Sequence, residues 1–303
     1  MNVLIVGSGV IGTVYGAQLG AAGHAITVLA HGERTDMVAV RGLRARDVSS
    51  GVETHAPVRV VSSAAAQDLD VVLVALRRDH LQSAVGTLSE ISLNALVLFI
   101  GNNPAGRAGI PSGSGARVAL GFPGVGGTIS AGVANYYKIA RQPTAIEATD
   151  EPRLAALADT LTARGLSVQR VADMDGWLAY HAVFIASICA ALYRCGTDPD
   201  RLAHSRATLK LMCLAITQGF RELRGAHVDG CPRNLWVLHS RWLIPVATRY
   251  WARAMRSPMG ELAFAAHARH AEPEMRALAG DVIARLGRAD AAITLRALLA
   301  SQP

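Results

Sequence analysis

The stretch NVLIVGSGVIG, residues 2–12, decides the fold of this chain. It opens with a short apolar run typical of a buried strand, and the residues after it read as a helix. Between the two lies the pattern G-x-G-x-x-G. Its first glycine makes a tight turn, the second lets a pyrophosphate approach the backbone, and the third lets the helix pack on the strand. The stretch therefore predicts a dinucleotide-binding βαβ unit. The residues expected to form its cofactor loop are Gly7, Ser8, Gly9, Val10, Ile11 and Gly12.

The end of the second predicted strand, LAHGER at residues 29–34, indicates which dinucleotide binds. NAD enzymes usually carry an acid here that holds the ribose 2′-hydroxyl, and no acid stands at the end of this strand. His31 and Arg34 instead offer cationic donors for a 2′-phosphate, which favours NADP(H). The alternative is that Arg34 is solvated and Glu33 takes the role of the acid.

The first half of the chain alternates apolar runs with helical segments, which is the signature of a parallel sheet with crossover helices. The predicted strands are NVLIV, AITVLA, DVVLVAL, ALVLFI and RVALGF. Gly-rich turns over residues 116–147 predict an antiparallel extension of this sheet, and one more strand is expected at 166–171. The rest of the chain predicts helices near 174–193, 200–225, 233–255 and 258–287. We therefore expect an α/β fold, with a doubly wound Rossmann-type domain over residues 1–172 and an all-helical substrate and dimerisation domain over residues 173–303.

Composition and charge exclude several classes of protein. The chain has 303 residues, of which 51% are hydrophobic and 17% charged, and this favours two folded domains over disorder. Its net charge of +7 has no basic run with interleaved aromatics beside it, so a phosphorylated small ligand is a better partner than nucleic acid. The cysteines lack zinc-type or CxxC spacing and read as reduced, packed thiols. No charged leader precedes an apolar segment at the N-terminus, so we expect a cytoplasmic protein.

The apolar run GWLAYHAVFIASICAALY, residues 176–193, is nearly long enough to span a membrane. Tyr180 and His181 lie inside it, and the chain has no second segment of this kind. Polar side chains of this type are costly in hydrocarbon. The run therefore predicts a buried helix and no membrane association.

Several motifs together resemble a known family. They are GSGVIG, LAHGERTDMVAVRGL, the strand DVVLVALR, the loop FIGNNPAG and a helical second half with a tryptophan near its start. Over nearly the whole chain these motifs look like the 2-ketopantoate reductase family, part of the 6-phosphogluconate-dehydrogenase-like group. The resemblance implies a Rossmann domain that binds NADP, a helical substrate domain and an NADPH-dependent reduction.

The resemblance also implies cofactor-binding positions. The family loop Gln-Asn-Gly is matched by residues 101–103, which places Asn102 near the nicotinamide. Arg77 matches the lysine that ends the third motif strand, and His31 matches the arginine at the 2′-phosphate. Both substitutions keep a cation, so we expect cofactor binding to survive.

The catalytic helix departs from the family pattern, which is tryptophan, then a lysine two residues on, then an asparagine four further. Counted from Trp177, these positions are Ala179 and Val183, so the proton donor and its partner are expected to be missing. The helical half has one lysine, Lys210, which lies a full helix away and is expected to snorkel at the surface.

The C-terminal motif is altered as well. Family members pair a serine with a later glutamate to hold the substrate, and anchoring that serine on SPMG, residues 257–260, aligns the glutamate with His270. His267 lies one helical turn from His270 on the same face. Glu272 and Glu274 are nearby acids, but neither is expected on that face at the right spacing.

Carbonyl reduction needs a hydride, a donor for the developing alkoxide, and a proton. Without the lysine, an imidazole is the best substitute, because its ordinary pKa of about 6.5 lets it donate near neutral pH. His181 projects roughly 200° around its helix from the lost lysine position, so it does not simply replace the lysine. The candidate catalytic residues are His270, His267, His181 and Asn102.

The sequence thus predicts an NADP-dependent oxidoreductase that has diverged from ketopantoate reduction. It is expected to reduce the C=O or C=N bond of a bulkier, less polar small molecule in specialised metabolism, because the apolar replacements remove the partners of a small keto acid. The helical half would suit a homodimer, on fold analogy alone. Two alternatives stay open: a non-redox protein that keeps NADP(H) as a structural or sensing ligand, and a non-redox enzyme on this scaffold.

Overall fold

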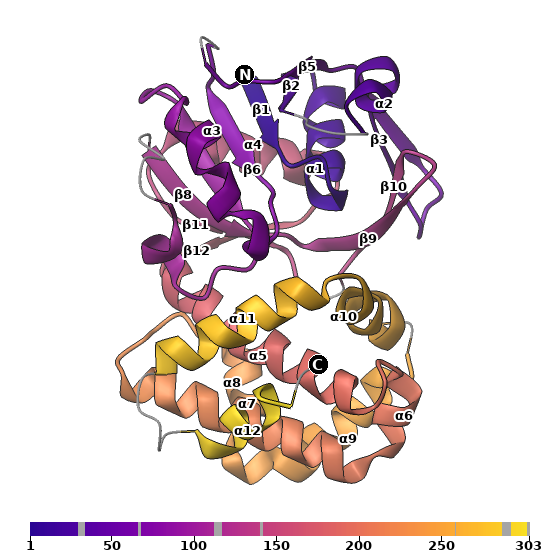
Figure 1. Ribbon diagram of the computed structural model, residues 1–303, viewed down its shortest axis with the longest axis vertical. Coiled ribbons are helices and arrows are strands. Elements are labelled where there is room, and N and C mark those ends of the chain that lie inside the picture. The colour runs from indigo at the N-terminus through magenta and orange to yellow at the C-terminus, as the bar shows by residue number, and fades with distance from the viewer. Residues whose placement is uncertain are drawn as a thin grey trace. The chain divides into compact units, whose positions relative to one another are not determined.

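The structure, a computed structural model, describes residues 1–29, 34–65, 68–111, 117–139, 142–257, 259–286 and 292–301. The chain forms two compact units, one α/β and one helical (Figure 1). Unit 1 comprises Met1–Gly101 and Ile110–Ala172, and unit 2 comprises Asn102–Gly109 and Asp173–Pro303. The short segment Asn102–Gly109 therefore belongs to the helical unit, although the chain enters it directly from a strand of unit 1.

Unit 1 is built on a sheet that has eight strands in the described part of the chain, in the order β12-β11-β8-β7-β6-β1-β2-β5. Six of these strands run parallel, and β11 and β12 run opposite to them. The expected Rossmann-type fold class is confirmed, because parallel neighbours need crossover connections such as the helices here. The strands are β1 (Asn2–Val6), β2 (Ala25–Leu29), β5 (Arg59–Val61), β6 (Val71–Val74), β7 (Leu96–Ile100), β8 (Arg117–Phe122), β11 (Thr144–Glu147) and β12 (Val168–Val171). The helices are α1 (Val10–Ala21), α2 (Arg34–Arg41), α3 (Val85–Ser89) and α4 (Pro152–Ala163).

A second, smaller sheet corrects one expectation. Its strands, in the order β4-β3-β10-β9, are β4 (Glu53–Ala56), β3 (Leu43–Asp47), β10 (Val133–Lys138) and β9 (Val125–Ser130). The expected antiparallel extension over residues 116–147 is confirmed for β11, which pairs antiparallel with β8, but β9 and β10 form a hairpin that pairs with β3 in the smaller sheet. The hairpin turns at Ala131 and Gly132, both with positive φ, and buries Tyr136, whose hydroxyl accepts from the Gln18 amide of α1 at 3.3 Å.

The described residues of unit 2 form helices joined by turns. Its first helix matches the predicted range, whereas the later ones are shorter than the sequence predicts. The helices are α5 (Met174–Arg194), α6 (Pro199–His204), α7 (Arg206–Gly225), α8 (Arg233–Leu238), α9 (Ile244–Met255), a π-helical turn (Gly260–Ala265), α10 (Ala266–His270), α11 (Glu272–Leu286) and α12 (Ile293–Leu299). The expected helix at 200–225 breaks at Ser205, whose side chain caps α7 by accepting from the Thr208 amide. The expected helix at 258–287 breaks at Ala271, since Pro273 is tolerated only in the first turn of a new helix.

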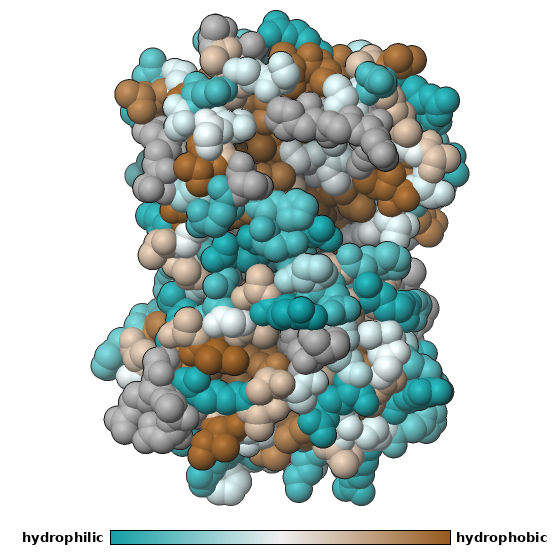
Figure 2. Space-filling model, in the orientation of Figure 1, coloured by the Kyte–Doolittle hydropathy of each residue, from teal (hydrophilic) through white to brown (hydrophobic). Residues whose placement is uncertain are grey.

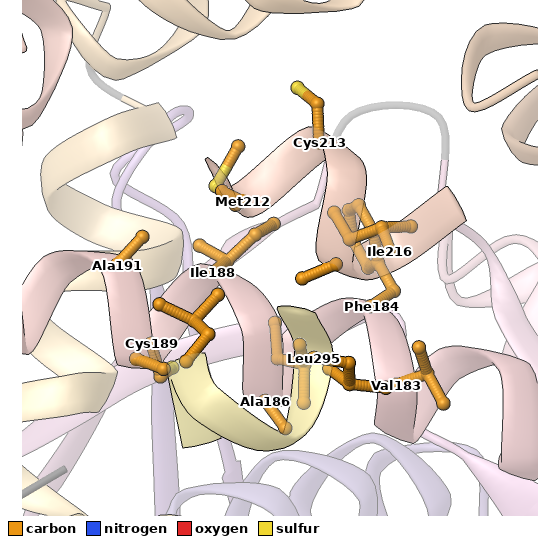
Figure 3. Close-up of a cluster of buried hydrophobic side chains, with 14 of the residues drawn as sticks. Val183, Phe184, Ala186, Ile188, Cys189, Ala191, Met212, Cys213, Ile216 and Leu295 are labelled. Atoms are coloured by element: carbon orange, nitrogen blue, oxygen red, sulfur yellow. The ribbon is translucent and has the colours of Figure 1, made fainter. Parts of the chain in front are cut away.

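The core of unit 2 is organised around α5, the helix formed by the long apolar run. α5 alone among the described residues is long and apolar enough to cross a membrane, and 89% of its most apolar window is buried inside the protein. Figure 3 shows Val183, Ile188 and Cys189 of α5 packed among side chains of α7 and α12. On the face shown in Figure 2 the surface of unit 2 is mainly hydrophilic, with smaller hydrophobic groups between. α5 is therefore the core helix of this unit, as the sequence predicts.

Candidate functional site

The glycine loop between β1 and α1 has the geometry that each glycine of the motif requires. Gly7 has φ +99°, and a Cβ there would lie 2.7 Å from the Ala75 carbonyl oxygen. A Cβ on Gly12 would collide with the Gly7 carbonyl oxygen, so a side chain at this position would push α1 off the strand. A Cβ on Gly9 would meet no described atom within 4 Å. Gly9 is thus the position where the fold leaves open space beside the backbone.

The N-terminus of α1 fits a phosphate. Gly9 is the N-cap residue, and α1 has neither a side-chain cap nor an acidic residue in its first turn. The first amides of a helix otherwise have no partner within the helix, and they carry the positive end of its dipole. Ser8, Val10 and Ile11 lie in the same loop, half-buried, and the Ser8 carbonyl accepts from the Thr13 hydroxyl. These residues would hold the pyrophosphate of a dinucleotide, because open space, amide donors and the helix dipole meet at one point.

The carboxyl ends of β1 and β6 lie side by side, since the two strands are parallel neighbours. Arg77 follows β6 and is half-exposed, with its guanidinium 3.7 Å from the Asp79 carboxylate and 3.3 Å from His80 Nε2. The segment before it touches the glycine loop through Ala75. Arg77 is therefore close in the chain to a segment that contacts the glycine loop, and its guanidinium is ion-paired with Asp79. The other predicted cation, His31, lies outside the described residues, and Arg34 begins α2 with its side chain outside them.

Asn102 is held in place by unit 2. Its side-chain amide donates to Glu274 Oε1 of α11 at 2.8 Å. The loop after it is tied down as well, because the Asn103 amide donates to the Gly106 carbonyl and the Arg107 backbone amide donates to Asp175 of α5. The Asn102 Oδ1 atom is buried and accepts no hydrogen bond from any described residue. A bound molecule with an N–H group would satisfy it.

Glu274 is the functional candidate that the sequence reasoning missed. Its side chain is only 6% exposed, and its Oε2 lies 4.0 Å from His267 Nε2. The expectation that neither Glu272 nor Glu274 shares the face of the histidines is wrong for Glu274. The π-helical turn Gly260–Ala265 and the break at Ala271 change the register, so ideal helical counting fails here. Pro273 was the signal that a new helix begins just before Glu274.

His267 and His270 both lie on α10, in different surroundings. The side chain of His267 is 36% exposed and faces Glu274, whereas His270 is exposed and its Nδ1 donates to the Ala266 carbonyl within the helix. The structure thus brings Asn102, Glu274 and His267 together, and it does not add His270 to that group. The catalytic role of each residue stays a prediction.

His181 is a buried member of α5. Its ring stacks on Trp177, with centroids 4.9 Å apart and planes 5° from parallel. Burial, and to a smaller extent the nearby His267, lower the pKa of His181 to about 3. His181 is therefore neutral at physiological pH and suited to packing or hydrogen bonding rather than to donating a proton.

The two positions aligned with the family's lysine and asparagine are apolar and internal. Ala179 and Val183 are 1% and 2% exposed, and Val183 lies close to Gly219 of α7. Lys210, on α7, is exposed, as expected. The chain's other lysine, Lys138, pairs with Asp47 in unit 1 at 3.2 Å. Unit 2 itself, whose one lysine is Lys210, therefore has no lysine bonded to Asn102 or Glu274.

Comparison with known proteins agrees with this architecture. Residues 3–106 match the family model described as Ketopantoate reductase PanE/ApbA, and no curated protein matches the chain. The PanE/ApbA family ketopantoate reductase from Ralstonia eutropha JMP134 has a TM-score of 0.76 at 23% identity, over 99% of this chain and 96% of that one. The dimeric ketopantoate reductase from Staphylococcus aureus has a TM-score of 0.71 at 14% identity, over 99% and 96%.

D-mandelate dehydrogenase, in a ternary structure with NADH and anilino(oxo)acetate, also has this fold. Its TM-score is 0.70 at 15% identity, over 100% of this chain and 98% of that one. Residues 3–106 are therefore similar to the ketopantoate reductase family model, and the chain has the fold of the solved ketopantoate reductases.

Proposed function

We propose that this chain is an NADPH-dependent reductase that acts on the C=O or C=N bond of a small molecule bulkier and less polar than ketopantoate. The observation that carries the proposal is the geometry of the glycine loop. Gly7 and Gly12 lie where a side chain would collide with backbone, and Gly9 has open space beside it, as dinucleotide binding requires. The likeness to a dehydrogenase solved with NADH supports it.

Different residues have different roles in the proposed reduction. A bound NADPH supplies a hydride from its nicotinamide ring. The backbone amides of residues 8–12 would hold the pyrophosphate, and the family resemblance assigns Asn102, which Glu274 holds in place, to the nicotinamide. For a carbonyl substrate, His267 Nε2 beside Glu274 Oε2 holds the proton that the oxygen takes up. His270 is the second candidate for this proton.

The dinucleotide preference gives the first test. Calorimetric titration is expected to show tighter binding of NADPH than of NADH. Arg34→Ala is expected to weaken NADPH binding by about ten- to a hundredfold and leave NADH unchanged, because a charge-assisted hydrogen bond to the 2′-phosphate contributes on the order of 1.5–3 kcal/mol.

The matched control is Arg41→Ala, at the other end of α2, which should bind both dinucleotides as the parent does. Equal loss of NADPH and NADH affinity in Arg34→Ala would contradict the assignment of the 2′-phosphate to Arg34. No binding of either dinucleotide would contradict the reductase itself. We also propose a homodimer, which the dimeric relative from Staphylococcus aureus supports by analogy.

A further inference from the structure

The buried carboxylate of Glu274 lacks a full cationic partner. Its side chain is 6% exposed, Oε1 accepts from the Asn102 amide at 2.8 Å, and Oε2 lies 4.0 Å from His267 Nε2. No arginine or lysine among the described residues of unit 2 forms an ion pair with it. The arginines nearby in sequence are engaged elsewhere: Arg276 pairs with Glu272 at 2.8 Å, and Arg269 pairs with Glu261. The Glu274 carboxyl group therefore lies in the interior of unit 2 with one amide and an imidazole 4.0 Å away as its described polar partners.

A buried carboxylate without a close cation lowers the stability of the folded protein, unless a ligand supplies the cation. Taking a carboxylate out of water costs several kcal/mol after relaxation, and a close, well-placed cation is the usual compensation in proteins. An imidazole at 4.0 Å that is 36% exposed gives only part of that compensation. A cationic ligand beside Oε2 would give the rest.

The other polar atom at this place is also an acceptor. Asn102 Oδ1 is buried without a donor among the described residues, because the amide nitrogen of the same side chain is committed to Glu274. The site thus offers two acceptor oxygens, Asn102 Oδ1 and Glu274 Oε2, and no described ammonium or guanidinium of unit 2 is bonded to either of them. A keto acid brings a carboxylate and an acceptor oxygen, which this set repels. A protonated imine brings a positive charge and an N–H donor, which this set binds.

We propose that the Asn102–Glu274 pair binds a protonated imine, so that the substrate of this site is a cationic C=N compound without a carboxylate; this rests on the reductase function proposed above. Hydride addition to the carbon of C=N⁺ moves the π electron pair to nitrogen and yields a neutral amine, while the reduced dinucleotide is oxidised. No proton is taken up in that step, because the nitrogen was protonated from water beforehand. A carbonyl, by contrast, needs a proton on the developing alkoxide. The absence of a lysine of unit 2 bonded to this pair is then expected, since an iminium ion needs no proton donor.

The carboxylate acts by favouring the reactive form of the substrate. A neutral imine accepts hydride poorly, and Glu274 stabilises its protonated form. For an ordinary imine, Glu274→Gln should therefore lower kcat/KM. For a permanently cationic iminium, the same change should raise KM and leave kcat nearly unchanged, because the charge is already present.

The test compares four probes with NADPH: dihydroisoquinoline, the permanently cationic N-methyldihydroisoquinolinium, the neutral ketone tetralone, and ketopantoate. We expect NADPH oxidation with the two C=N compounds and at least tenfold less with the ketone and the keto acid. Glu274→Gln should lower kcat/KM for dihydroisoquinoline about a hundredfold. The glutamine side chain still accepts from the Asn102 amide through its oxygen, so the fold is kept. Glu272→Gln removes a carboxylate that is paired with Arg276 on the same helix. It should leave kcat/KM unchanged for both C=N compounds.

A binding measurement gives a readout besides turnover. N,N-dimethyltetrahydroisoquinolinium is a permanent cation that accepts no hydride, and calorimetry should show at least tenfold weaker binding of it to Glu274→Gln than to the parent or Glu272→Gln. Equal binding to all three, or faster reduction of tetralone or ketopantoate than of the imines, would overturn the cationic substrate while leaving the reductase in place. Normal NADPH binding with no oxidation by any of the four probes would count against the reductase function instead.

Discussion

Gly9→Ala is expected to weaken NADPH binding about a hundredfold, a loss of about 2.7 kcal/mol, with little change in stability. The added methyl group meets no described atom within 4 Å, so the folded protein accepts it. The same methyl group stands where a pyrophosphate must approach the backbone. An alanine N-cap costs about 1 kcal/mol at most relative to glycine. Calorimetric titration with NADPH and thermal unfolding measure the two effects separately.

Two further variants control this result. Gly12→Ala places its Cβ on the Gly7 carbonyl oxygen, so it should lower the free energy of unfolding by about 3 kcal/mol and abolish binding by moving α1. Gly86→Ala, in open space on α3, should change neither quantity. If Gly9→Ala binds NADPH as tightly as the parent does, the glycine loop is not the pyrophosphate site.

Asn102→Asp is expected to destabilise unit 2 by about 3 kcal/mol, because it sets a second carboxylate against a buried one. Adding Glu274→Gln to the same chain should restore most of that loss. The glutamine amide then donates to the new carboxylate, which reverses the direction of the hydrogen bond and leaves a single negative charge. All four tryptophans lie in unit 2, so unfolding followed by tryptophan fluorescence reports on this unit.

The control for this pair is Asn94→Asp, an exposed asparagine in a turn of unit 1, which should shift stability by less than about 0.5 kcal/mol. Additive effects of Asn102→Asp and Glu274→Gln would mean that the two side chains do not interact. A stable Asn102→Asp variant would show that Glu274 is not held as an anion beside residue 102.

The main sheet and its glycine loop could be predicted from the sequence because their signals are local. Each buried parallel strand is a short apolar run, and Gly7, Gly9 and Gly12 have fixed spacing next to one of them. The smaller sheet was not predicted, because β3 and β10 pair although they are far apart in the sequence. Their sequences, LRARD and VANYYK, are also not apolar enough to indicate a buried strand. Pairing of this kind depends on long-range contacts that no short window contains.

The candidate site was predicted in part for a similar reason. Asn102 was found because residues 101–103 match the Gln-Asn-Gly loop of the family that the chain resembles, and His267 because it lies one helical turn from His270, which aligns with the family's glutamate. Glu274 was dismissed because the counting assumed one ideal helix from residue 258 onward. A π-helical turn and a new helix start after Ala271 rotate Glu274 toward Asn102 instead. Small departures from 3.6 residues per turn move a side chain to another face, and a motif count does not detect them.

Transfer of deuterium from NADPH to product tests the central claim, that the chain is a reductase, most directly. The protein is incubated with NADPH deuterated at either face of nicotinamide C4, together with dihydroisoquinoline, N-methyldihydroisoquinolinium, tetralone and ketopantoate, and the products are analysed by mass spectrometry. A reductase is expected to transfer deuterium from one face of the nicotinamide only. The reduced product is then heavier by one mass unit with one of the two labelled cofactors and unlabelled with the other. Unchanged NADPH and unlabelled compounds, in protein that binds NADPH normally, would contradict the account and leave the dinucleotide as a structural or sensing ligand.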